Sequence, residues 1–147
     1  MEKLLNNQVV EQIQQAFAQF KEPVRILFFG SKENCGYCDE TRQLLEEVVV
    51  LHDQLSLEVY DLQENADVAA KFNVDKSPVI VLAALDGTEV TDLGIQFSGI
   101  PSGHEFGTFI NDILLVSGRD SRLSPQTRAF LQGLEKPLHL QVFVTPT

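Results

Sequence analysis

The order of apolar segments along the chain constrains the fold more than any other feature of the sequence. Short runs rich in branched and aromatic residues alternate with segments whose apolar residues recur at helical spacing. Asp86-Gly87 separates the last two runs, which is typical of a hairpin. We therefore expect a mixed sheet covered by helices on both faces. The expected strands are 24–29, 55–62, 79–85 and 89–97, and the expected helices are 4–20, 44–51, 65–72 and 102–116.

Polar residues and glycines mark several helix ends. Asn65 is expected to cap the helix 65–72, and 102–105 (Ser-Gly-His-Glu) has the pattern of a capping box for the helix that ends near Val116. Ser124-Pro125 and Gly133 bracket a further helix, with the expected cap, first-turn proline and terminal glycine.

The C-terminal residues repeat an earlier pattern. Segments 21–31 and 135–145 each contain a charged pair, a proline, five or six strand-forming residues and a small hydroxyl residue, and each follows a helix. We therefore divide the chain into 1–118, one unit with an N-terminal helical extension, and 119–147, a linker helix and the first strand of a truncated second unit. A chance similarity of two proline-led strands is the alternative.

Charge and hydropathy exclude several partners. The formal net charge is −10 at pH 7, so nucleic acid and anionic membrane surfaces would be repelled. No apolar run is long enough to span a bilayer, and residues 1–8 lack a basic stretch leading into an apolar signal core. We expect a cytoplasmic protein without nucleic-acid or membrane partners.

Cys35 and Cys38 are the two cysteines of the chain, separated by Gly36 and Tyr37. A bond across two residues closes a loop too short to stabilise a fold much. At the start of a helix, however, the first thiol lies near unpaired N–H groups and the positive end of the helix dipole, which favours its thiolate. We expect Cys35 to attack a substrate disulfide and Cys38, the more buried thiol, to resolve it. The two thiols suffice for this exchange, so no cofactor is expected.

The charges near the pair are mixed. Lys32 and Arg42 would favour a thiolate on Cys35, whereas three acids oppose it. We therefore expect moderate activation. The opposing acids are Glu33, Asp39 and Glu40.

A zinc site is the alternative use of the pair. Such a site needs four ligands, and the histidines His52, His104 and His139 lack the paired spacing of a zinc finger. Metal binding is therefore the weaker interpretation, and we expect no metal.

Ser77-Pro78 stands forty residues after Cys38, behind a short helix that ends in Phe72. With the cysteine pair after a strand and the hairpin turn, this arrangement resembles the thioredoxin superfamily over residues 24–116. The resemblance implies an α/β thioredoxin fold, with a central mixed sheet flanked by helices, an extra N-terminal helix and a C-terminal helix–strand extension. It also implies that the Ser77-Pro78 peptide is cis. Substrate binding would fall to Gly36, Tyr37, Ser77 and Pro78.

The N-terminal helix and the repeat of the 21–31 pattern from Glu135 onward resemble one branch of the superfamily. This branch is the two-unit glutaredoxin-like protein disulfide oxidoreductases, in which each unit carries a cysteine pair. The two-unit domain that donates electrons in bacterial peroxide reductases is built similarly, but its first unit has typically lost the pair. Because both cysteines are present, the resemblance favours the first unit of the oxidoreductase branch.

The sequence departs from the thioredoxin pattern in two places. Asn34 stands where thioredoxins have tryptophan, and the strand 26–29 lacks the buried acid that accepts a proton from the second cysteine. Glu33, Asp61, another carboxylate or solvent would have to replace that acid.

The expected function is thiol–disulfide exchange with protein substrates through Cys35 and Cys38. The alternative is a non-catalytic thioredoxin-like binding or electron-relay module of a larger two-unit protein. Expected partners are protein disulfides or dithiols and a thioredoxin-reductase-like electron donor. A homodimer is a further expectation, because the strand 138–144 would present an unpaired edge.

Overall fold

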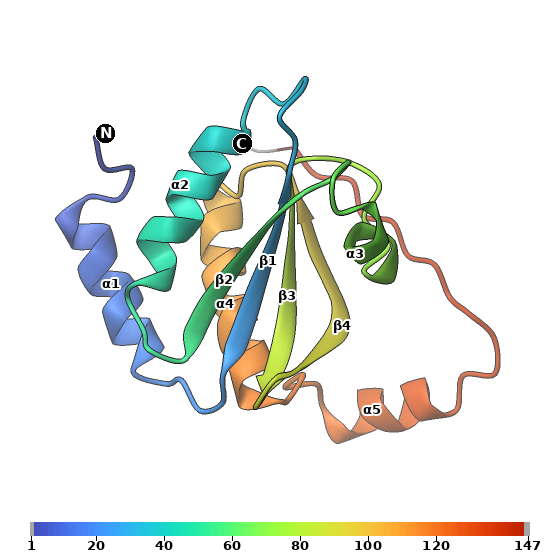
Figure 1. Cartoon of the computed structure of the whole chain (residues 1–147). Helices are drawn as coiled ribbons and strands as arrows, with labels where there is room; N and C mark the ends of the chain where they lie inside the picture. Colours follow the sequence, from blue (N-terminus) through green and yellow to red (C-terminus); the bar gives the residue numbers. More distant parts are fainter. Residues whose placement is uncertain (1, 146–147) are drawn as a thin grey trace.

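The computed structural model describes residues 2–145, within which four strands form a single sheet of order β2-β1-β3-β4 (Figure 1). β1 and β2 are parallel, and β3 runs antiparallel to both β1 and β4. This is the mixed sheet that the alternating pattern predicts. The strands are β1 (Val24–Gly30), β2 (Leu55–Asp61), β3 (Val79–Asp86) and β4 (Glu89–Ser98).

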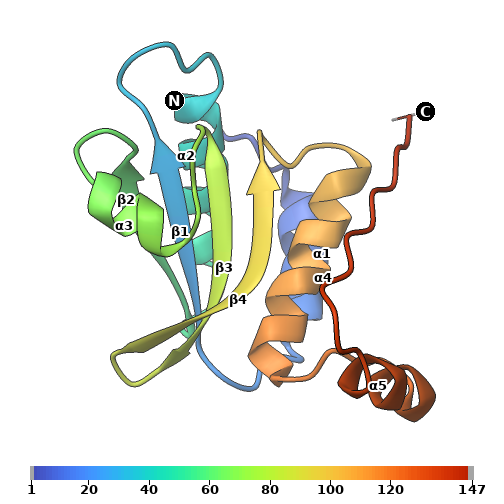
Figure 2. The ribbon, with the colours of Figure 1, turned by 90° about the vertical axis from the view of Figure 1, so that its right-hand side faces the viewer.

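Helices cover both faces of the sheet, as predicted. Figure 2 shows α3 on one side and α1 and α4 on the other, and α2 packs into the same apolar cluster as α1 and α4. None of the helices in the described part of the chain is long and apolar enough to cross a membrane. The helices are α1 (Asn7–Phe17), α2 (Cys38–Val49), α3 (Ala66–Lys71), α4 (His104–Gly118) and α5 (Pro125–Gln132).

β1 is the central strand that carries the cysteine loop, and its side chains alternate between the two faces. Ile26 and Phe28 pack with α1, α2 and α4, whereas Leu27 and Phe29 pack on the opposite side with residues of α3. A strand buried on both faces is apolar throughout. This explains the unbroken apolar run, and it fixes the end of β1 as a rigid platform for the residues that follow.

Two of the predicted helix caps are wrong. Asn65 precedes α3, but its side chain makes no capping bond and its Oδ1 accepts from Asp61 N instead, at 3.0 Å. The residue before α4 is Gly103 with φ of 60°, not Ser102, so the predicted capping box does not form. A side-chain cap needs extended backbone at the N-cap residue, and neither position provides it.

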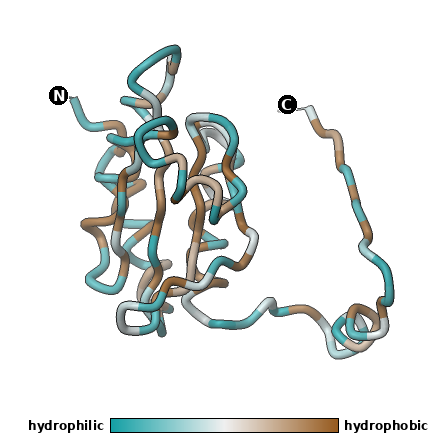
Figure 3. Tube along the Cα trace, turned by 45° about the vertical axis from the view of Figure 1, so that its right-hand side comes forward, coloured by the Kyte–Doolittle hydropathy of each residue, from teal (hydrophilic) through white to brown (hydrophobic). Residues whose placement is uncertain are grey.

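The C-terminal segment is built differently from the rest. Ser124 caps α5 by accepting from Thr127 N, as predicted, and residues 134–145 carry no assigned strand. Every described residue from Arg119 onward is exposed. Figure 3 shows apolar residues along this segment outside the packed body. The predicted strand at 138–144 would need pairing partners from the rest of a second unit. The second unit therefore stays a prediction.

Arg119 still belongs to the packed body through its side chain. Its guanidinium donates to the carbonyl oxygens of Pro23 and Leu85, at 3.0 and 3.1 Å, and pairs with Asp86 at 3.0 Å. These bonds close the end of the sheet opposite the cysteine loop.

Candidate active site

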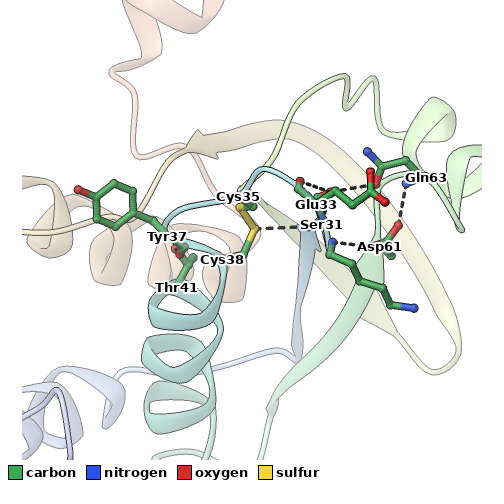
Figure 4. Close-up of a disulfide and its surroundings, with 9 residues drawn as sticks. Ser31, Glu33, Cys35, Tyr37, Cys38, Thr41, Asp61 and Gln63 are labelled. Carbon is green, nitrogen blue, oxygen red and sulfur yellow. Dashed lines mark hydrogen bonds between the residues drawn. A yellow bond between two sulfur atoms is a disulfide. The ribbon is translucent and has the colours of Figure 1, made fainter.

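Cys35 and Cys38 form a disulfide in the loop that joins β1 to α2 (Figure 4). Cys38 is the first residue of α2, as the sequence predicts for a pair at a helix start. Cys38 is only 7% exposed, whereas Cys35 is half-buried. The expected difference in burial between the two cysteines is therefore confirmed.

The two residues between the cysteines face solvent. Tyr37 is 63% exposed, and Figure 4 shows its ring directed away from the disulfide. Its carbonyl accepts from both the amide and the hydroxyl of the buried Thr41, at 3.0 and 2.6 Å. The first turn of α2 is thus anchored beneath an exposed surface formed by Gly36 and Tyr37.

The sulfur of Cys38 rests on the end of β1. A Cβ atom at Gly30 would lie 3.5 Å from Cys38 Sγ and 3.2 Å from the ring of Phe28, so the strand end has little room for a side chain. The N–H of Ser31 donates to Cys38 Sγ at 3.4 Å. Sequence reasoning treated Gly30 and Ser31 only as a strand end. A glycine directly between an apolar strand and a cysteine loop was the signal for this close approach.

Asp61 connects the cysteine loop to the loop after β2. Its Oδ2 accepts from Lys32 N at 3.1 Å, and its Oδ1 accepts from Gln63 N and Glu64 N at 2.9 and 3.0 Å. The bond from the Glu64 amide is the main cause that lowers the pKa of Asp61, with the Gln63 and Lys32 amides adding to it against the effect of burial. The carboxylate is therefore used as an acceptor for backbone amides.

Both bases near the pair are already bound to acids. Lys32 forms an ion pair with Glu64, which raises the pKa of Lys32, and Arg42 pairs with Glu46 one turn along α2 at 2.8 Å. Their charge is thus partly compensated. The helix start remains as the main feature that favours a thiolate, and the moderate activation of Cys35 stays a prediction.

The Ser77-Pro78 peptide is cis, as the resemblance predicts. Pro78 directly precedes β3, whose first residue Val79 pairs with Phe29 of β1. The cis peptide therefore lies at the same end of the sheet as Gly30 and the cysteine loop. The carbonyl of Pro78 accepts from Gly99 N at 2.9 Å, which ties the loop before β3 to the end of β4.

Asn34 adopts a left-handed backbone, with φ of 54°, immediately before Cys35. Asparagine tolerates this region far better than bulky residues do. The absence of the thioredoxin tryptophan at this position thus has a local cause in the path of the loop.

The histidines do not approach the cysteines as a ligand set. The ring of His52 stacks on Phe20 at 4.3 Å, and its Nδ1 accepts from Gln54 N at 3.2 Å. Within residues 2–145, no three His, Cys, Asp or Glu side chains are grouped so as to hold a metal ion. These contacts give His52 a packing role.

Residues 25–100 match the sequence profile of the Glutaredoxin-like domain (DUF836), which covers more than half of the chain. The chain belongs to the glutaredoxin-like domain family. Together with the thioredoxin fold and the disulfide, this membership makes it a thioredoxin-like redox module.

The glutaredoxin-like chain also has longer relatives. It is 28% identical over 144 residues to AhpF, a component of the alkyl hydroperoxide reductase of Staphylococcus epidermidis, and the match covers 98% of this chain and 25% of the relative. The chain therefore spans about a quarter of the length of such a relative. That relative belongs to the peroxide-reductase branch, which the sequence analysis favoured less than the oxidoreductase branch.

Solved structures of both branches share the fold. AhpF of the alkylhydroperoxide reductase of Enterococcus faecalis superposes with a TM-score of 0.78 at 25% identity, over 91% of this chain and 62% of that chain. A protein disulfide oxidoreductase of Aeropyrum pernix gives 0.75 at 23% identity, over 90% and 57%. The likeness to the second structure is one of fold.

Proposed function

We propose that this glutaredoxin-like chain is a thiol–disulfide oxidoreductase unit, in which Cys35 and Cys38 exchange disulfides with protein substrates. The observation that carries the proposal is the disulfide itself, between a half-buried cysteine and a buried one at the start of α2. This asymmetry supports a role for Cys35 in the attack on the substrate disulfide and a role for Cys38 in resolving the mixed disulfide.

The reaction needs two exchange steps. In the reducing direction, the Cys35 thiolate attacks a substrate disulfide, so that a Cys35–substrate bond forms and one substrate sulfur leaves with the electron pair. The Cys38 thiolate then attacks Cys35 Sγ, the Cys35–Cys38 disulfide forms, and the second substrate sulfur leaves. Two electrons pass from the cysteine pair to the substrate, and solvent protonates the released thiolates.

Substrate binding is assigned to Gly36, Tyr37, Ser77 and Pro78. Apart from the neighbouring residues 35 and 37, no heavy atom of the described chain lies within 4 Å of where a Gly36 Cβ would be, and Tyr37 is 63% exposed. The cis peptide lies at the same end of the sheet. An extended substrate chain would thus find open surface on the helix side of the disulfide and the cis-proline loop on the strand side.

Insulin reduction by dithiothreitol tests the proposal. The wild-type chain should accelerate the reaction, and Cys35→Ser should remove the acceleration. Tyr37→Ala should raise the substrate concentration needed for half-maximal rate, whereas Val50→Ala, which alters another exposed apolar side chain just after α2, should not. Equal rates for Cys35→Ser and wild type would contradict catalysis by this pair.

Trapping tests the assignment of the two steps. Cys38→Ser should accumulate a mixed disulfide between Cys35 and a protein substrate, because resolution is blocked. Mass spectrometry after acid quenching reads this adduct. Accumulation by Cys35→Ser instead would reverse the assignment.

A second candidate is an electron-relay module of a larger protein, with a thioredoxin-reductase-like flavoprotein as its donor. The coverage of the Staphylococcus epidermidis relative, 98% of this chain but 25% of that protein, favours it. A dedicated relay would be reduced and reoxidised by small dithiols and disulfides but would not accelerate insulin reduction. The two candidates therefore give opposite results in the same assay.

A further inference from the structure

Cys38 packs on one side in the apolar core, and its thiol has to ionise there without the acid found in thioredoxins. Residues 26–29 are Ile-Leu-Phe-Phe, none more than 2% exposed, and Cys38 itself is 7% exposed. Burial among apolar side chains disfavours a thiolate. Rapid resolution of a mixed disulfide thus requires another group that stabilises the charge on Cys38.

The N–H of Ser31 is placed to do this. Its nitrogen lies 3.4 Å from Cys38 Sγ, and Figure 4 shows this bond from the strand side of the disulfide. A disulfide sulfur is a weak acceptor, whereas a thiolate is a charged acceptor that gains more from the same donor. The bond therefore favours the thiolate of Cys38 over its thiol.

The peptide groups on both sides of Ser31 are held by the loop after β2. The Gly30–Ser31 peptide, which carries this N–H, is anchored by Leu62 N, which donates to Gly30 O at 2.8 Å. The Lys32 amide donates to Asp61, whose other oxygen accepts from the amides of Gln63 and Glu64. Asp61 thereby links the cysteine loop to the β2–α3 loop, beside the bond from Ser31 Oγ to Gln63 Oε1 at 3.0 Å and the Lys32–Glu64 ion pair. Because three amides stabilise its charge, Asp61 remains ionised at neutral pH.

We propose that Asp61 is a positioning residue for resolution, which holds the Ser31–Lys32 turn so that the Ser31 N–H stabilises the Cys38 thiolate. The inference rests on the proposed function, in which that thiolate attacks Cys35 Sγ and the substrate sulfur leaves with the electron pair. The Cys38 proton passes to solvent beforehand. The Ser31 amide stabilises the charge left on Cys38, and solvent takes the proton that a buried carboxylate accepts in thioredoxins.

Other charged groups face Cys38 across a hollow of about 280 Å³. Removing a negative charge from this hollow would by itself favour the thiolate, whereas loss of the Asp61 contacts disfavours it. The sign of the change in an Asp61 variant therefore separates positioning from simple charge. The titratable side chains that line the hollow are Lys32, Asp39, Arg42, Tyr60, Asp61 and Glu64.

The first experiment titrates Cys38 alone. In a Cys35→Ser background Cys38 is the sole thiol, and its ¹³Cβ chemical shift against pH gives its pKa. We expect Asp61→Ala to reduce the thiolate fraction at neutral pH roughly tenfold, because a hydrogen bond to a charged acceptor is lost. Asp39→Asn, the matched change of an acid that lines the same hollow, should leave this fraction equal or raise it.

Variants of Ser31 test the donor itself. Ser31→Pro removes the N–H and should reproduce the loss. Ser31→Ala keeps the N–H and removes only the hydroxyl bonds to Glu33 and Gln63, so its loss should be clearly smaller. Asp61→Asn keeps one acceptor oxygen and should give an intermediate thiolate fraction. Thermal unfolding checks that each variant folds. If Ser31→Pro does not fold, the Asp61 variants test the proposal.

The second experiment measures resolution without a protein substrate. Glutathione is attached to Cys35 in the protein that retains both cysteines, and its release by Cys38 is followed. Release should be roughly three- to fivefold slower in Asp61→Ala, since a more basic thiolate is scarcer but also more nucleophilic.

An unchanged release rate, or a raised thiolate fraction in Asp61→Ala, would overturn the proposal. The predicted changes together with no acceleration of insulin reduction would support the role of Asp61 and contradict only general oxidoreductase activity.

Discussion

The packed body and the C-terminal segment use apolar side chains in opposite ways. Phe109 of α4 is fully buried and its ring contacts Phe97 at 5.5 Å, whereas Phe130 of α5 is 65% exposed. The same residue type therefore contributes to the core in one region and faces solvent in the other. The disulfide resides in the body, whereas the apolar side chains of the segment are exposed.

We propose that residues 119–147, of which 146–147 lie outside the described residues, are the linker helix and first strand of a second thioredoxin-like unit. The repeat of 21–31 at 135–145 supports this division, as do relatives four times as long. The alternative is a homodimer in which residues 138–144 of two copies pack together, and light scattering at high concentration tests it. The exposed apolar residues of the segment are Leu123, Phe130, Leu131, Leu134, Leu138, Leu140, Val142, Phe143 and Val144.

The largest difference between the regions should come from their phenylalanines. Phe109→Ala should lower the free energy of unfolding by about 3–5 kcal/mol, because it leaves a cavity in the core. Phe130→Ala should change it by less than about 0.5 kcal/mol. Urea unfolding followed by circular dichroism measures both. A comparable loss in Phe130→Ala would mean that α5 is packed in solution.

The glycines give a smaller contrast. Gly30→Ala should cost about 1–3 kcal/mol, because the new methyl group presses on Phe28 and on Cys38 Sγ. Gly133→Ala meets only ordinary contacts of 3.5 Å or more and should be nearly neutral. Chemical denaturation of the oxidised proteins compares them. Full stability of Gly30→Ala would show that the strand end is looser than described.

The cap of α5 tests whether the segment folds independently of the body. Ser124→Ala should reduce the helicity of 125–132, since a lost cap costs about 1 kcal/mol and a short helix without packing is marginal. Cα chemical shifts report this loss. The urea midpoint of the body should not move, and Ser102→Ala, at a position that caps nothing, should leave α4 intact. A shifted urea midpoint of the body in Ser124→Ala would show that the two regions unfold as one cooperative unit.

The smallest effect concerns pH and the N-terminal segment. Burial acts to raise the pKa of Glu47, but bonds from the amides of Leu4 and Leu5 and the side chain of Gln43 outweigh it and lower the pKa. A lowered carboxyl pKa contributes stability above the unfolded value, and this is lost as the pH falls through the folded value.

Glu47→Gln should therefore lose less than about 1 kcal/mol at pH 7, because the group is largely solvated, and about nothing near pH 3. Urea unfolding at the two pH values measures the difference. Glu135→Gln, in the exposed segment, serves as the control and should show none. An equal loss at both pH values would assign the effect to side-chain shape.

Local patterns predicted most elements of the body. The apolar run of β1 and the Asp86-Gly87 hairpin depend on neighbouring residues, so the sequence alone reveals them, and the same holds for the Ser124 cap in the C-terminal segment. The caps at Asn65 and Ser102 failed because capping depends on backbone angles set by the preceding loops. The Lys32–Glu64 pair and the Lys32–Asp61 bond join residues about thirty apart, which no local pattern reports. The cis peptide came from the family resemblance.

The reduction potential of the Cys35–Cys38 couple tests the central claim most directly. The protein is equilibrated in glutathione redox buffers, quenched, and its thiols counted by alkylation and mass spectrometry. A working pair should show one two-electron transition between about −270 and −120 mV, the range of thioredoxin-type couples. A disulfide that stays closed below about −300 mV would be structural and would contradict the account.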